Sequence, residues 1–311
     1  MRAVATSPLD KPASQADRIE NGWERIKKPV YYGILILWAL IALAPFYFTL
    51  VFALKPVANS YTPPIFWPAP FTLDNFRTVI QSFELVPRWL LNSTIVSVVV
   101  TVLRVLFASM AGYAFARMEF PGKNVLFSAV LITIMIPNQV ILIPKYIVIG
   151  PGIVRDLEIG GIEIPTGFGL LNTLWGVMLH DLVTAFAVFM MAQFFKSIPK
   201  ELEEAAMMDG LGRFGIFFRI VLPISQTQLL TLGVLTFQGV WNEFLMPLVI
   251  LRSPDKYTLP IGLQWFQGEY YTLYSIVLAG SLFNTIPILI LFFLFQRYFV
   301  QNVATTGLKD I

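Results

Sequence analysis

Few residues in this chain could carry chemistry, and those that could are polar groups inside long apolar segments. The sequence holds no Cys and one His, which excludes disulfides, thiolate metal sites, cysteine nucleophiles and multi-histidine metal centres. It also lacks a Gly-x-x-x-x-Gly-Lys-Ser/Thr loop, the usual device for holding ATP phosphates. We therefore expect no catalytic residue, no metal site and no cofactor in this chain, and no enzyme activity of its own.

Three polar residues within apolar segments are candidates for a translocation path: Asn242, Glu243 and Asn284. A polar or ionisable side chain at membrane depth is costly and usually faces the interior of a helix bundle or a watery cavity. An alternative for Glu243 is that it only holds its helix in position, for example against Arg104.

The single histidine, His180, lies beside Asp181 in another apolar segment. Such a pair could relay protons. Hydrogen bonding between helices is the commoner role for buried polar neighbours, so we favour the structural interpretation.

Composition indicates that these groups sit in a membrane protein. Of 311 residues, 56% are hydrophobic and 13% are charged, whereas soluble domains carry about 25% charged residues. The net charge of +3 fits the Lys and Arg that membrane proteins collect in cytoplasmic loops. We expect contact with membrane lipid and no nucleic-acid partner.

The apolar segments predict an all-α fold, a polytopic membrane helix bundle with six transmembrane helices. A span needs roughly 20 apolar residues. The predicted spans cover residues 30–54, 89–113, 124–146, 171–195, 224–251 and 272–298. The outer connector 150–169 is rich in Gly and Pro, which predicts turns.

Lys and Arg predict the orientation. With the N-terminus inside, fourteen lie in the predicted cytoplasmic segments and seven in the outer loops, which places both termini in the cytoplasm. Residues 1–29 form a cytoplasmic tail, and residues 30–311 form one transmembrane domain with a cytoplasmic loop at 196–223.

That loop carries the signals of two helices. Ser197 is a suitable N-cap, and Pro199 is tolerated in the first turn of a helix. Gly210 suits the left-handed position that ends a helix. We predict one helix over residues 198–209 and a second over 213–221.

Small and apolar side chains on this helix pair favour docking to another protein. One side of the first helix groups Leu202, Ala205, Ala206 and Asp209 at helical spacing, and the two alanines form a flat strip. The second helix offers Phe214 and Phe218. The alternative is that these residues lie on the membrane surface or pack under the bundle.

The run from Ser197 to Gly210, including Glu204-Ala205-Ala206, followed by Ile220-Val221-Leu222-Pro223, resembles the EAA loop of ABC-importer permeases. The stretch Trp241-Asn242-Glu243-Phe244 resembles the carbohydrate subgroup, and the maltose-type second permease subunit in particular. Met207-Met208 and Leu211-Gly212 depart from the pattern but preserve the helix–turn–helix. The resemblance runs from about residue 30 to the end.

The resemblance implies the type I ABC-importer permease architecture in the cytoplasmic (inner) membrane. It implies cytoplasmic ATP-binding subunits that bind ATP and Mg, a second permease subunit, an extracytoplasmic solute-binding protein and a sugar substrate. Residues Glu204, Ala205, Ala206, Asp209, Gly210, Phe214 and Phe218 would couple the chain to the ATPase.

Three alternatives remain. The solute could be different, such as glycerol phosphate or a peptide, although Arg104 as the only cation inside a span favours a neutral sugar. An autonomous ion-coupled carrier is disfavoured by the docking loop and by the absence of an evident inverted repeat. An intramembrane enzyme lacks paired catalytic residues.

Overall fold

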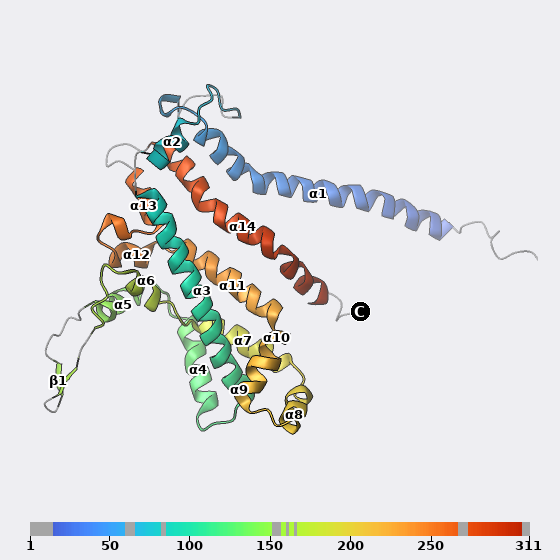
Figure 1. The fold of residues 1–311 in the computed structure, drawn as a ribbon. Coiled ribbons are helices and arrows are strands. Elements are labelled where there is room, and N and C mark those ends of the chain that lie inside the picture. The colour runs from blue at the N-terminus through green and yellow to red at the C-terminus, as the bar shows by residue number, and fades with distance from the viewer. Residues whose placement is uncertain are drawn as a thin grey trace, which may run out of the picture.

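The computed structural model describes residues 15–59, 66–81, 85–150, 157–159, 162–164, 167–266 and 273–306. Three helices in this part are long and apolar enough to cross a membrane: Lys27–Ala53, Val86–Arg117 and Tyr274–Arg297. They belong to α1 (Gln15–Ala53), α3 (Val86–Arg117) and α14 (Tyr274–Thr306) (Figure 1). These three helices coincide with the first, second and sixth predicted spans.

Each of the other three predicted spans contains two shorter helices. The pairs are α4 (Lys123–Ile134) with α5 (Leu142–Ile149), α6 (Leu174–Leu179) with α7 (Ala185–Ser197), and α11 (Gln226–Trp241) with α12 (Leu245–Ile250). Pro137 lies in the first break, where a missing N–H and steric clash oppose helix continuation. In the second break, the Thr184 hydroxyl accepts a hydrogen bond from the Ala187 N–H at 3.3 Å and starts a new helix.

The number of spans therefore differs from a simple count of apolar segments. The described residues contain three spanning helices, or four if Arg213–Ile224 and Gln226–Trp241, which meet at 78°, form one bent span. The helix-bundle class is as predicted.

The remaining helical elements of the described residues are short. They are η1 (Val57–Asn59), α2 (Asp74–Gln81), α8 (Glu201–Met208), α9 (Arg213–Ile216), η2 (Phe217–Val221), α10 (Leu222–Ile224), η3 (Pro254–Lys256), α13 (Leu259–Gly262) and η4 (Leu263–Phe266). Figure 1 places α8 and α13 at opposite ends of the bundle, which we call the α8 end and the α13 end.

Two predicted segments differ in the structure. Helix α1 begins at Gln15, so residues 15–29 of the predicted tail are helical, while residues 1–14 lie outside the described part. The connector 150–169 contains two antiparallel strands, β1 (Leu157–Ile159) and β2 (Ile162–Ile164), with Leu157 opposite Ile164. Apolar residues alternate with Glu in both strands, as the two-residue period of a β-strand predicts.

Among the described residues, the core consists of three clusters of buried apolar side chains, and α3 contributes to all of them. Tyr113 belongs to the cluster at the α8 end, Val100 to the middle cluster and Trp89 to the cluster at the α13 end. At Gly112 an added Cβ would lie 2.8 Å from Met191 Cβ on α7. Gly112 thus allows the close contact between α3 and α7 that is typical of membrane helix bundles.

Candidate functional site

The α8 loop (residues 196–223) joins α7 to α11 and forms the predicted pair of helices. Helix α8 ends at Met208, with Asp209 at the C-cap, and the next residue, Gly210, has a φ of 84° in the left-handed region. The Gly210 N–H donates to the Met207 carbonyl, and the Leu211 N–H donates to the Ala206 carbonyl, both at 3.0 Å. This is the Schellman pattern, so Gly210 ends the helix as predicted.

The start of α8 differs from the prediction. Ser197 is the last residue of α7, and its hydroxyl donates to the Phe194 carbonyl at 2.7 Å. A serine can bond backward to a preceding carbonyl or forward as a cap, and here it bonds backward. Helix α8 begins instead at Glu201, with Lys200 at the N-cap and no side-chain cap. The second helix continues from α9 through the π-helical turn η2 into α10.

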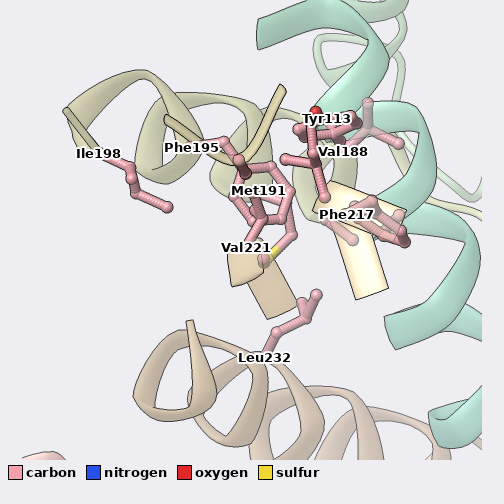
Figure 2. Close-up of a cluster of buried hydrophobic side chains, with 12 residues drawn as sticks. Tyr113, Val188, Met191, Phe195, Ile198, Phe217, Val221 and Leu232 are labelled. Carbon is pink, nitrogen blue, oxygen red and sulfur yellow. The ribbon is translucent and has the colours of Figure 1, made fainter. Parts of the chain in front are cut away.

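Exposure divides the predicted coupling residues into two groups. An outward group consists of Glu204, Ala205, Asp209, Gly210, Phe214 and Phe218, all of which are exposed. In contrast, Ala206 is 4% exposed and belongs to the buried cluster shown in Figure 2. Ala205 and Ala206 therefore do not form one outward strip, because α8 turns Ala206 toward the bundle.

A buried polar contact beneath α8 was not predicted from the sequence. Glu203 lies on the same face as Ala206, three residues away, and is 9% exposed. Its Oε1 lies 2.8 Å from Arg117 Nε, and its Oε2 accepts a hydrogen bond from the Tyr113 hydroxyl at 3.0 Å. In the sequence, only the three-residue spacing between Glu203 and Ala206 indicates that Glu203 shares a helix face with Ala206. That spacing does not identify Arg117 or Tyr113 as its partner.

Gly210→Val is expected to destabilise the end of α8, because a β-branched residue is strained at positive φ. The left-handed conformation costs a non-glycine residue roughly 1–2 kcal/mol. We expect faster cleavage of the α8 loop in limited proteolysis of the purified protein. Gly210→Asn is the control, since asparagine tolerates this conformation; equal cleavage of both variants would contradict the assignment.

Asn242 and Asn284 meet where the α11–α12 pair is broken. Asn284 Nδ2 donates to Asn242 Oδ1 at 3.2 Å, and Trp241 Nε1 donates to the Asn284 carbonyl at 2.9 Å. Glu243 Oε1 accepts a hydrogen bond from the Met246 N–H at 3.3 Å, at the start of α12. The structure thus joins two of the three path candidates and supports a helix-positioning contact for Glu243.

Arg104 pairs with Asp181, not with Glu243. Its guanidinium forms an ion pair with the Asp181 carboxylate, and its Nε donates to the Asp181 carbonyl at 2.8 Å. The suggested pairing of Glu243 with Arg104 is therefore wrong. His180 Nδ1 is buried and makes no hydrogen bond within the described residues, and Asp181 is held by Arg104. The ion pair ties α3 to the break between α6 and α7, which favours the structural interpretation over a proton relay for Asp181.

At the α13 end, Asn172 joins two loops. Its φ is 58°, and its Oδ1 accepts hydrogen bonds from the N–H groups of Arg252 and Ser253, both at 3.0 Å. The Lys256 ammonium donates to the Asn172 carbonyl at 2.9 Å. Asparagine is one of the few residues that tolerate this backbone conformation, so this side chain fixes the loop 250–256 against the start of α6.

Long apolar helices, close small-residue contacts and polar pairs between helices define a membrane-embedded helix bundle. The family model for binding-protein-dependent transport system inner membrane components matches residues 104–305. The chain belongs to this family.

Relatives of known type cover most of the chain. An arabinooligosaccharides transport system permease protein of Halalkalibacterium halodurans is 40% identical over 245 residues, covering 79% of this chain and 82% of the relative. A lactose transport system permease protein of Rhizobium radiobacter is 30% identical over 280 residues, covering 90% and 96%.

The fold is also similar to a solved structure. A chain in the crystal structure of a bacterial ABC transporter involved in the import of the acidic polysaccharide alginate matches with a TM-score of 0.72 and 23% identity. The match covers 93% of this chain and 99% of that chain.

Proposed function

We propose that this chain is the membrane-spanning permease subunit of an ATP-driven importer for sugars, with oligosaccharides or disaccharides as substrates. Family membership and the sugar-transport names of its relatives support this role. The chain forms half of the translocation path with a second permease subunit. An extracytoplasmic binding protein delivers the sugar, and cytoplasmic ATP-binding subunits hold ATP and Mg.

The outer face of the α8 loop supports the energy-coupling part of this proposal. Met208 is 89% exposed, Phe214 75% and Met207 52%. They lie on α8 and α9, between apolar segments, where polar residues would suffice for a connecting loop. Exposed apolar side chains grouped in this way mark an interaction site. We assign it to the ATP-binding subunit, with Glu204, Ala205 and Asp209 beside them.

This assignment places the α8 loop and both termini in the cytoplasm. The fourteen-to-seven distribution of Lys and Arg supports that orientation. The α13 end then faces the solute-binding protein on the outer side of the membrane.

The contacts of Arg104 favour a neutral sugar over a phosphorylated solute. The guanidinium is already paired with Asp181, so this cation is not free for a phosphate group. The amides of Asn242 and Asn284, joined at the helix break, offer neutral donors and acceptors of the kind that bind sugar hydroxyls.

Met208→Glu tests the coupling surface. We expect the tagged variant, purified in mild detergent from its native membrane, to retain roughly tenfold less ATP-binding subunit, which corresponds to about 1.4 kcal/mol of lost binding. Ala206→Glu is unsuitable, because Ala206 is buried in the chain's own core. Glu119→Lys is the control, since its side chain is 89% exposed and lies outside the α8 loop.

Subunits are identified by mass spectrometry. Recovery of the ATPase and a second permease with wild type and Glu119→Lys, but not with Met208→Glu, supports the proposal. Recovery of the wild-type chain alone, with uptake that continues without ATP, would show instead an autonomous carrier.

A further inference from the structure

The buried Glu203 carboxylate links α8 to the end of α3. Arg117 and Tyr113, one turn apart on α3, contact its two oxygen atoms at 2.8 and 3.0 Å. The Arg117 guanidinium also donates to the carbonyl of Ile198, ahead of α8. Two neighbouring side chains of α3 therefore hold the α8 loop both before the helix and within it.

Apolar packing already holds this region together without a charge. Ile198, Ala206 and Phe217 lie in the same buried cluster as Tyr113 (Figure 2). The Tyr113 and Phe217 rings lie 5.1 Å apart between centroids. Apolar contact is non-directional, whereas the hydrogen bond from the Tyr113 hydroxyl to the carboxylate has a preferred direction, and the Arg117 guanidinium adds an ion pair. The polar contact therefore adds a fixed position of α8 on α3.

Helix α3 has a second set of polar contacts at its other end. Asn92 Nδ2 donates to the carbonyls of Asp255 and Tyr257 at 3.0 and 2.9 Å. Trp89 Nε1 donates to the Pro254 carbonyl at 2.6 Å. The 32 residues of α3 are unbroken and extend about 48 Å at 1.5 Å per residue. One continuous helix thus joins the α8 loop to the loop at the α13 end.

We propose that Glu203 is the positioning residue that transmits movement of α8 to α3, and through α3 to the loop 254–257 at the opposite end of the bundle. This inference rests on the proposed ATPase docking at α8. Docking and transmission are then separate roles of α8: its exposed face binds the ATPase, and its buried face transmits the movement to α3. Rigid elements with fixed contacts at both ends are suited to such coupling.

Glu203→Gln separates the two roles. In the complete transporter, reconstituted with its ATPase, second permease and binding protein, we expect normal retention of the ATPase. Sugar uptake per ATP hydrolysed is expected to fall about tenfold, within the range typical of coupling between two sites. Glu201→Gln, an exposed glutamate in the same first turn, is expected to behave as wild type.

Two further variants test whether the link itself matters. The charge swap Glu203→Arg with Arg117→Glu is expected to recover part of the uptake per ATP lost in either single variant. Because the chain contains no Cys, the pair Glu203→Cys with Arg117→Cys can be joined by a bifunctional thiol reagent. We expect this pair to be uncoupled before the reaction and coupled after it.

The outcomes distinguish this inference from the proposed function. Normal uptake per ATP in Glu203→Gln, or no gain on joining the cysteine pair, overturns the role of Glu203 and leaves ATPase docking intact. Loss of the ATPase from Glu203→Gln alone would place Glu203 in docking and also overturn the inference. Failure of the wild-type chain to retain an ATPase would instead remove the proposed function.

Discussion

Arg104→Met is expected to lower the free energy of unfolding by roughly 3–5 kcal/mol, the usual cost of removing one partner from a buried ion pair. The side chains of Arg104 and Asp181 are 9% and 24% exposed, so solvent screens the pair only weakly. The substitution leaves the carboxylate without its cation. It also removes the donor from the Asp181 carbonyl. Thermal unfolding of the purified protein in detergent measures the loss.

A double variant checks that the loss comes from the pair. Arg104→Met with Asp181→Leu is expected to be more stable than Arg104→Met alone, because apolar residues often replace a buried ion pair at little cost. Arg77→Met is the control: its pair with Asp74 spans 3.9 Å, with side chains 71% and 79% exposed. Such surface pairs contribute about 0–1 kcal/mol. Equal destabilisation by Arg77→Met and Arg104→Met would contradict this account.

Gly262→Val is expected to destabilise the α13 end by about 1–3 kcal/mol or more, as overpacking of a well-packed core does. An added Cβ at Gly262 would overlap the Trp89 indole, and even the Cζ3 atom of that ring would be only 2.6 Å away. Trp89 cannot easily move, because it is fully buried and its Nε1 bonds to the Pro254 carbonyl. The thermal midpoint should fall, and Trp fluorescence should report a displaced indole.

Gly239→Ala is the matched control for Gly262→Val. Gly239 lies within α11, and a Cβ there would meet no atom within 4 Å. Alanine is favoured over glycine inside a helix by roughly 0.5–1 kcal/mol, so we expect unchanged or slightly higher stability. If both variants unfold at the wild-type temperature, Gly262 does not lie in close contact with Trp89.

Local patterns explain which elements were predictable. The spans at α1, α3 and α14 follow from long apolar runs, and the end of α8 follows from Gly210. The breaks at Pro137, Thr184 and Glu243 were missed, because a run of apolar residues looks continuous even where a proline or a capping side chain interrupts the helix. The strands β1 and β2 were missed, because three-residue strands in a Gly-rich segment resemble turns.

The candidate site was predictable in part. The sequence identified the α8 loop, and it named Asn242 and Asn284, which the structure joins although they are 42 residues apart. It assigned Ala206 to the outer face and suggested the wrong partner for Arg104. Helical spacing shows which residues share a face, but the direction of that face depends on what the helix packs against.

Composition, motif spacing and backbone preference are local properties, so the membrane class, the family resemblance and the helix–Gly–helix of the α8 loop could be predicted without a structure. Three contacts are visible only in the folded chain: Glu203 with Arg117 and Tyr113, Asp181 with Arg104, and Gly262 with Trp89. Each of these contacts joins residues between 77 and 173 positions apart. Such contacts cannot be predicted locally, because a buried polar group or a close backbone contact depends on the partner that folding brings to it.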